Sequence, residues 1–366
     1  MGIRVAATRI VPPVALILVP LVAFAIMFRI SYGNGSFAID FHNEIYPEAK
    51  ELLRGQDPFP SPTADLTRGS NHIWPPLVGY VAIPLTLLSP SAADIVMVFL
   101  GIACFGAALW TVGVRDWRVY GGSLLWAPVI GEMRTAHLSL ILCFLVALVW
   151  RTRARTAVPG LVLGFAIGLK FFLWPLIPWL ASMRRWREAG IAIATAAASL
   201  LLLLPFIGIL EYARLLRRLG AAFDQDSFSP YGVLVQAGAP SSVARVTTFV
   251  VGAAFLAIAW RRRSFALFIA AALLLSPIVW LDYFAITAIP LAVVRPTFSW
   301  VWLLPILTWG VPSSGAGIGV LTQTIRVMAV FAAIVWYTER RERHLFPDGL
   351  PGFNALGAPS AATAKL

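Results

Sequence analysis

The sequence predicts an all-α polytopic membrane protein. Of its 366 residues, 59% are hydrophobic and only 13% are charged, whereas charged residues make up about a quarter of a soluble domain. The mean hydropathy is +0.80. Long apolar runs alternate with short arginine clusters, which is typical of helices that cross a bilayer repeatedly. Most of the chain is therefore expected to lie in lipid.

The first span is predicted from the uncharged run between Val11 and Phe28. This run is long enough to cross a hydrocarbon core of about 30 Å as a helix. Arg4 and Arg9 precede it, which places the N-terminus in the cytoplasm by the positive-inside rule. A cleaved signal peptide is the alternative, but the run is long and has no clear small-residue cleavage site before Ser31.

Arginine clusters orient the remaining segments, and we place all of them in the cytoplasm. The clusters are Arg115/Arg118, Arg151/Arg153/Arg155, Arg184/Arg185/Arg187, Arg261 to Arg263, Arg295 and Arg340/Arg341/Arg343. The expected spans are residues 10–30, 92–113, 119–131, 137–150, 157–169, 171–182, 190–208, 244–260, 265–280, 284–294, 298–311 and 319–337. Several are too short for a full crossing, so the sequence predicts about 10 to 12 membrane or half-membrane helices, some of them broken around a protein-walled cavity.

These spans define one membrane domain over residues 1–343, with both termini in the cytoplasm. Residues 31–91 form the first extracytoplasmic loop, in which Pro75 to Leu88 is expected to be a helix lying on the outer surface. Residues 209–243 form a second large outer loop. The tail, residues 344–366, is rich in Pro, Gly and Ala and is expected to be disordered and cytoplasmic.

The net charge of +12 does not indicate nucleic-acid binding, because the arginines lie in topology-setting clusters. Cys104 and Cys143 both lie in apolar segments, so neither a disulfide nor a thiolate metal site is expected. Two further motifs are set aside. Asp224-Gln225-Asp226 has a form associated with nucleotide sugars but falls on the outer side, and the Gly-rich segment before Lys170 lacks the residue order of a P-loop. We expect no cofactor and no metal.

The topology collects four polar groups on the outer side of the membrane. They are Asp40 with the helix that follows it, Gly131 to His137, Lys170, and Asp282. Ionisable groups at membrane depth are costly and usually mark a functional site. Their convergence from distant parts of the chain therefore predicts a site at the outer surface.

Asp40 begins a charged stretch that predicts an amphipathic interfacial helix. Ile45, Ala49, Leu52 and Leu53 share one helical face, while Glu44, Glu48, Lys50, Glu51 and Arg54 fall elsewhere. Pro47 is acceptable near the helix start, and Gly55 is expected to stop the helix. Asp40 is a candidate for chemistry, and the alternative is that its carboxylate caps this helix or is solvated in a loop.

The other polar groups each have two interpretations. Lys170 either snorkels to the interface or binds a phosphate. The segment with Glu132, Arg134 and His137 either forms a turn whose polar side chains pair with one another or binds a sugar or phosphate. Asp282 is flanked by Trp280 and Tyr283, which are either interfacial anchors or a platform for a sugar.

The chain resembles glycosyltransferase family 87, whose members have the C-type glycosyltransferase fold and use polyprenyl-phosphate sugars. The resemblance is carried by the following residues, in this order along the chain: Asp40-Phe41 with Tyr46, Ala49, Leu52, Leu53, Gly55, Pro58 and Phe59; Trp74-Pro75-Pro76-Leu77; Gly164, Gly168 and Lys170 before Arg184-Arg185-Trp186; and Ser276-Pro277 with Trp280. Two positions depart from the family pattern. Gly131-Glu132 stands where many members have Gly-Gln, and Leu281-Asp282 stands where many have a His.

The resemblance implies a multi-pass plasma-membrane enzyme that transfers a sugar, most often mannose, to a lipid or glycan acceptor on the outer face. Its partners are then a polyprenyl-phosphate-linked sugar, that acceptor and the membrane lipids. Asp40 matches the family's catalytic Asp, and a carboxylate base suits the removal of the acceptor proton. The leaving phosphate needs no acid, so a single inverting displacement with one carboxylate suffices.

The resemblance also suggests roles for the other polar residues. Lys170 and Arg134 are candidates for binding the donor phosphate. The candidate substrate-binding residues are His42, Glu44, Tyr46, Glu132, His137, Asp282 and Tyr283.

Two other functions compete with the transferase. A transporter or lipid flippase also has many spans and broken helices, but its polar site is expected near the bilayer midplane. A scaffold subunit of an envelope-glycan complex would tolerate the loss of Asp40.

Overall fold

A computed structural model of the protein describes residues 2–67, 73–223, 225–311 and 320–346, with side chains described from Ala15 onward. All regular secondary structure in these residues is helical. The first half of the chain forms α1 (Gly2–Gly33), η1 (Phe41–Ile45), α2 (Tyr46–Leu53), α3 (Pro76–Ala82), η2 (Ile83–Leu87), α4 (Pro90–Thr111), α5 (Trp117–Leu124), α6 (Ala127–Ile130), α7 (Glu132–Thr135), α8 (Ser139–Thr152), α9 (Val158–Leu169), η3 (Phe171–Leu173) and α10 (Leu176–Ser182). The second half forms α11 (Trp186–Leu200), η4 (Leu201–Leu203), α12 (Ile209–Ala222), α13 (Pro230–Gln236), α14 (Ser241–Arg262), α15 (Phe265–Leu274), η5 (Leu281–Thr287), α16 (Ala288–Val294), η6 (Trp300–Thr308) and α17 (Leu321–Leu345).

The prediction of an all-α polytopic membrane protein is confirmed. Among the described residues, five segments are long and apolar enough to cross a membrane: 15–33, 90–111, 186–203, 241–262 and 321–345. Shorter apolar helices occupy 76–87, 139–152, 158–169, 171–182, 265–274 and 281–294. The expected span 119–131 is broken into α5 and α6, with Pro128 in the first turn of α6. Short helices of this kind occur at membrane depth where neighbouring helices surround them.

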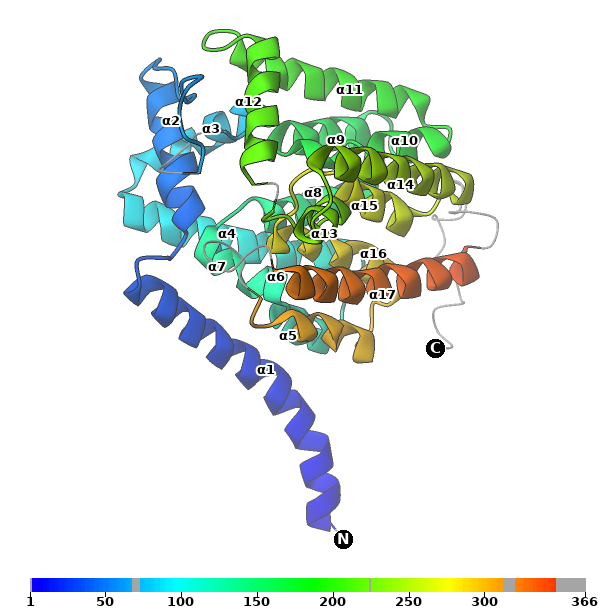
Figure 1. The fold of residues 1–366 in the computed structure, drawn as a ribbon. Coiled ribbons are helices and arrows are strands. Elements are labelled where there is room, and N and C mark those ends of the chain that lie inside the picture. Colours follow the sequence, from blue (N-terminus) through cyan, green and yellow to red (C-terminus); the bar gives the residue numbers. More distant parts are fainter. Residues whose placement is uncertain (1, 68–72, 224, 312–319, 347–366) are drawn as a thin grey trace.

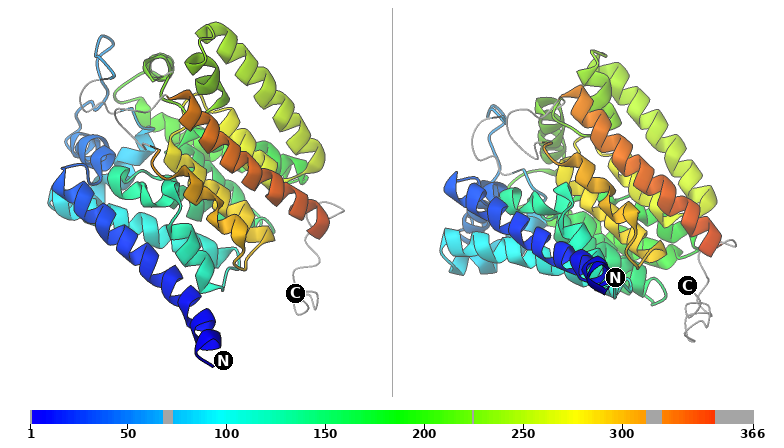
Figure 2. Two further views of the ribbon diagram at one scale, coloured as in Figure 1. Left: turned by 60° about the horizontal axis from the view of Figure 1, so that its bottom comes forward. Right: turned by 90° about the horizontal axis from the view of Figure 1, so that it is seen from below.

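Helix α1 lies at the edge of the bundle, and its N-terminal end extends beyond the other helices (Figure 1). It packs mainly on α5, where a Cβ added to Gly121 would meet the carbonyl oxygen of Leu16 at 2.0 Å. Apolar side chains along the rest of α1, such as Leu21 and Ile26, are exposed. The long helices α14 and α17 lie on the opposite side of the bundle (Figure 2). An exposed apolar surface of this length fits contact with lipid.

Helix α9 packs closely on α11 through a stripe of glycines, Gly160, Gly164 and Gly168. A Cβ on Gly164 would meet the Thr195 Cβ at 2.5 Å and the Ala192 carbonyl oxygen at 2.6 Å. Small residues at four-residue spacing allow two helix backbones to approach in this way. This packing positions the C-terminal end of α9, which Lys170 directly follows.

The segment after Asp40 differs in part from the predicted amphipathic helix. It begins as a π-helical turn, η1, and continues as α2, which has Pro47 in its first turn and ends before Gly55 at φ +69°. Ile45, Ala49 and Leu52 are buried as expected. However, Leu53 is exposed, and Glu48 is completely buried against Gly79 of α3. The packing of α3 on α2 therefore buries the Glu48 carboxyl, which the sequence pattern assigned to the polar face.

The Pro75–Leu88 segment is helical, as α3 and η2. At the other end of the chain, α17 continues through Leu345, so His344 and Leu345 belong to a helix and not to the predicted disordered tail. Residues 347–366 of that tail lie outside the described residues, as does Asp224 of the Asp-x-Asp motif. Leu345 continues the helix because α17 packs on α15, where Glu342 accepts hydrogen bonds from Ser264 and from the Phe265 backbone N–H.

Candidate active site

Asp40 lies at the start of η1, in a loop that is fixed to α7. Ala38 is fully buried with φ +52°, and its backbone N–H donates to the Met133 carbonyl oxygen at 3.0 Å. A left-handed alanine is strained and is held only where the surrounding structure demands it. The Asp40 side chain makes no capping hydrogen bond to the helix that follows, and it is 21% exposed. Its carboxylate is thus available for other contacts.

His137 joins two carboxylates that are far apart in the sequence. Its Nε2 lies 2.5 Å from Asp40 Oδ2, and its Nδ1 lies 3.0 Å from Asp282 Oδ2. Ser139 donates a hydrogen bond to the same oxygen of Asp282. Neutral imidazole has only one N–H, so His137 can donate to both carboxylates only as imidazolium. The structure thus brings together three predicted site residues in one chain of contacts, Asp40–His137–Asp282.

The backbone before His137 explains its orientation. Ala136 ends α7 in the left-handed region, at φ +49°, and its N–H donates to the Glu132 carbonyl oxygen at 2.6 Å. This sharp reversal between α7 and α8 directs the His137 ring towards both Asp40 and Asp282, and Asp282 itself lies in the first turn of η5. The contact between His137 and Asp282 therefore depends on the packing of α8 against η5.

Lys170 is a buried cation without a hydrogen-bond partner among the described residues. Its Nζ lies 3.7 Å from the centre of the Tyr283 ring and 5.1 Å from the centre of the Trp74 ring. Its charge interacts with those of Asp282, Glu132, Asp40 and Glu44. Aromatic faces stabilise an ammonium but accept none of its N–H groups in the way an oxygen does. These three donors are free to bind an anion.

Glu132 lies in α7 and is 1% exposed, and neither of its carboxyl oxygens has a hydrogen-bond partner among the described residues. Burial raises its pKa well above the usual value, and the charge of Asp282 adds to that effect. A carboxyl that is protonated can donate one hydrogen bond and accept others. Glu132 makes no ion pair with Arg134 among the described residues, so the self-satisfied turn that the sequence allowed does not form.

A second carboxyl, Glu44, faces Asp40 from the next turn of η1. Burial and then the charge of Asp40 raise the pKa of Glu44 to about 7. The indole Nε1–H of Trp74 donates to Glu44 Oε2 at 2.7 Å. The Trp74 ring also meets the His137 ring edge to face, with 5.2 Å between their centres. Glu44 and Trp74 therefore join one group of polar and aromatic side chains, called the cluster below. Its other members are Asp40, Glu132, His137, Ser139, Lys170, Asp282 and Tyr283.

The remaining predicted site residues occupy other positions. His42 is exposed, and its Nδ1 lies 2.8 Å from Asp94 Oδ2 of α4. Tyr46 is buried, and its hydroxyl donates to the Leu88 carbonyl oxygen at 2.8 Å. Arg134 is half-buried in α7. These contacts fix η1 and α2 to η2 and α4, and they do not connect His42 or Tyr46 to the cluster.

Sequence reasoning missed two members of the cluster, Trp74 and Ser139. Trp74 counted only as part of the Trp-Pro-Pro-Leu resemblance, although an aromatic residue followed by two prolines is itself a signal of a restricted backbone. No local pattern marks Ser139, because its partner Asp282 is 143 residues away. Among the described residues, no three His, Cys, Asp or Glu side chains are arranged to bind a metal ion together.

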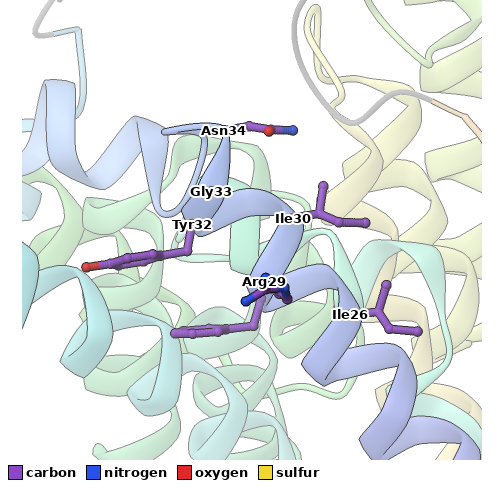
Figure 3. A pocket seen from close by; sticks show the side chains of 7 residues that line it. Ile26, Arg29, Ile30, Tyr32, Gly33 and Asn34 are labelled. Carbon is purple, nitrogen blue, oxygen red and sulfur yellow. The ribbon is translucent and has the colours of Figure 1, made fainter.

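A separate groove of about 640 Å³ runs along the C-terminal end of α1 (Figure 3). It is lined by Ile26, Phe28, Arg29, Ile30, Tyr32, Gly33 and Asn34. Asp40, His137, Asp282 and Lys170 are not among these lining residues, so their cluster lies apart from this groove.

The cluster offers a partly exposed carboxylate beside an ammonium whose donors are free, in a setting walled by aromatic rings. Such a pair can accept a proton from one substrate and stabilise negative charge on another. The comparison with known proteins agrees with a group-transfer site in a membrane. No curated protein and no solved structure matches the chain. A family model described as glycosyltransferase family 87 matches residues 72–281, which is more than half of the chain and includes Trp74, His137 and Lys170. The protein belongs to glycosyltransferase family 87 and is a membrane glycosyltransferase.

Proposed function

We propose that the protein transfers a sugar from a polyprenyl-phosphate donor to a lipid or glycan acceptor at the extracytoplasmic face of the plasma membrane. Mannose is the sugar that the family resemblance favours. Asp40 acts as the general base in a single inverting displacement. The observation that carries this proposal is the buried ammonium of Lys170, which has no hydrogen-bond partner among the described residues, near the partly exposed Asp40 carboxylate. A buried charge without a hydrogen-bonded partner is costly, so its retention indicates a ligand of opposite charge.

The chemistry of the two groups is complementary. The acceptor hydroxyl loses its proton to Asp40 while its oxygen bonds to the anomeric carbon. The bond between that carbon and the phosphate oxygen breaks at the same time, and the electron pair stays on the phosphate. Lys170 stabilises the charge that grows on this leaving group, so no acid is required. Inversion at the anomeric carbon follows from one displacement.

His137 and Asp282 orient the base in this proposal. The His137 imidazolium donates to Asp40 Oδ2, so Asp40 Oδ1 remains to accept a hydrogen bond from the acceptor hydroxyl. Asp282 and Ser139 hold the far side of the ring, which keeps the imidazole from rotating away. Hydrogen-bonded partners behind a reacting group commonly fix its direction in this way. Glu132, with both oxygens unused, is placed to bind hydroxyl groups of the sugar.

The proposal is tested with purified protein in lipid nanodiscs, a set of polyprenyl-phosphate sugars and a panel of lipid and glycan acceptors. Asp40→Asn is expected to lower kcat by about 10²- to 10⁴-fold, as the loss of a general base does. Asp57→Asn is the matched control, because Asp57 is an exposed acid of the same loop. Near-normal turnover of a well-folded Asp40→Asn variant would remove Asp40 as the base. Transfer from nucleotide sugars alone would remove the proposed donor class.

A further inference from the structure

We propose that Trp74 is a positioning residue that fixes both the phosphate-binding ammonium of Lys170 and the carboxyl of Glu44. This inference rests on the proposed function of Lys170 and Asp40. It assigns two separable tasks to one side chain. The ring face of the indole holds Lys170, and the indole N–H holds Glu44.

Trp74 contacts three ionisable groups that come from different parts of the chain. Its ring centre lies 5.1 Å from Lys170 Nζ and 5.2 Å from the centre of the His137 ring. Its Nε1–H donates to Glu44 Oε2 at 2.7 Å. Lys170 follows α9, His137 precedes α8 and Glu44 lies in η1, so the indole stands where these elements meet.

The backbone supports a fixed orientation of this ring. Pro75 and Pro76 follow Trp74 directly and open α3. A residue before proline is restricted to extended conformations, and proline itself has a fixed φ. Pro75 and Pro76 are both buried. The indole therefore projects from a backbone segment whose conformation is restricted.

Lys170 Nζ lies close to two rings, 3.7 Å from the centre of the Tyr283 ring and 5.1 Å from the centre of the Trp74 ring. Tyr283 is itself stacked on Phe172, with 4.9 Å between ring centres. Without the indole, the ammonium loses one of its two aromatic neighbours and gains freedom to turn towards Asp282 or Glu132. Binding of the lipid phosphate then weakens, whereas the base Asp40 is untouched.

Glu44 is surrounded by charged groups from several elements. Asp40 and Glu48 face it along its own helical segment, His137 faces it from the turn before α8, and Lys170 from the end of α9. The Trp74 hydrogen bond favours the ionised form of Glu44 against burial and against Asp40. The negative charge of an ionised Glu44 close to Asp40 favours transfer of the acceptor proton to Asp40. Turnover of the wild type should therefore rise as Glu44 ionises, around pH 7.

Two substitutions separate the tasks. Trp74→Phe keeps a ring beside Lys170 and His137 but removes the N–H. It should leave the donor KM within about twofold, and it should move the rise of kcat/KM with pH upward by about one pH unit, because one hydrogen bond to a charged group is lost. Trp74→Leu removes the ring as well. It should raise the donor KM, and the inhibition constant of sugar-free polyprenyl phosphate, by about three- to tenfold.

Trp309 provides the matched control, because its indole N–H also donates a hydrogen bond, to the Leu125 carbonyl oxygen and not to a carboxylate. Trp309→Phe and Trp309→Leu should leave both the pH profile and the inhibition constant unchanged. Thermal unfolding of each variant in detergent reports whether the fold is retained.

The same variants separate failure of the positioning role of Trp74 from failure of the proposed function. If Trp74→Leu binds polyprenyl phosphate as the wild type does while Lys170→Met does not, Trp74 has no role in holding the ammonium. If Trp74→Phe keeps the wild-type pH profile while Glu44→Gln abolishes the rise, Trp74 does not govern Glu44. If Asp40→Asn and Lys170→Met are both as active as the wild type, the proposed function fails first, and the inference fails with it.

Discussion

Asp40 and His137 are in direct contact, with 2.5 Å between Asp40 Oδ2 and His137 Nε2. Asp40 comes two residues after Ala38, at φ +52°, and His137 comes directly after Ala136, at φ +49°. Both alanines are buried and lie in the left-handed region. Strained backbone of this kind persists where the surrounding packing enforces it, and it clusters at functional sites. The pair is therefore built by two separate loops that are each held in one unusual conformation.

Asp282→Asn should lower kcat by about 10²-fold or more, because an amide holds His137 less firmly than a carboxylate and shifts the proton between its two ring nitrogens. The donor KM should stay within about twofold, since Asp282 does not bind the donor in our proposal. Initial rates over a range of donor concentrations measure both constants. An unchanged kcat in a folded variant would show that the His137–Asp282 contact does not serve turnover.

Lys170→Met should raise the inhibition constant of polyprenyl phosphate by about 10- to 100-fold, as the loss of a hydrogen bond between charged groups does. Methionine fills the same buried space without a charge. Lys50→Met is the control, because Lys50 also lies over a tyrosine ring, 4.9 Å from the centre of Tyr46, but outside the cluster. Equal binding by both variants would contradict the phosphate-binding role.

Glu48→Gln should stabilise the protein at alkaline pH. Glu48 is fully buried, and burial, followed by the charge of Glu44, raises its pKa well above the usual value. A carboxyl with a raised folded-state pKa favours folding below its usual pKa, and this contribution is lost as the pH rises through the raised value. The glutamine variant should therefore unfold at a higher temperature than the wild type at pH 9, and the advantage should shrink towards pH 5.

The control for this pH series is Asp57→Asn, which changes an exposed acidic residue in the loop after α2. It should leave the difference in Tm between pH 5 and pH 9 as it is in the wild type. A Glu48→Gln advantage that is the same at both pH values would mean that ionisation of Glu48 is not the cause.

Gly164→Ala and Gly190→Ala should change stability in opposite directions. A methyl group on Gly164 would overlap Thr195 and the Ala192 carbonyl, so the α9–α11 contact must open, at a cost of about 1 to 3 kcal/mol. Gly190 lies in α11 with nothing within 4 Å of an added Cβ. Alanine there should stabilise the helix by about 0.5 to 1 kcal/mol. Thermal unfolding in detergent measures both changes, and a loss of activity is expected only for Gly164→Ala, since α9 positions Lys170.

The proposed orientation is tested by cysteine labelling in a variant that lacks Cys104 and Cys143. Gln56→Cys lies in the loop after α2 and Thr156→Cys between α8 and α9, and both positions are exposed. A membrane-impermeant thiol reagent added to intact cells should label Gln56→Cys alone. Thr156→Cys should react only after the cells are opened. The reverse pattern would place the cluster on the cytoplasmic side.

The apolar helices follow from local sequence, because a long uncharged run must satisfy its backbone hydrogen bonds internally in lipid. The sequence also marked Asp40, Lys170 and Asp282, since charged side chains in such a chain are rare. It did not determine that Glu48 would be buried or that Leu53 would be exposed. Helical periodicity shows which residues share a face of the helix, whereas the packing of α3 on α2 decides which face is covered.

The pairing of the polar groups depends on how distant segments of the chain pack together. His137 and Asp282 are 145 residues apart, and the hydrogen bond between them exists because α8 packs on η5. Trp74 became a central residue through its contacts with Glu44, His137 and Lys170, none of which is its neighbour in the sequence. Local sequence encodes helix formation and membrane insertion, which depend on near neighbours. The geometry of this site depends on long-range packing, which no local pattern contains.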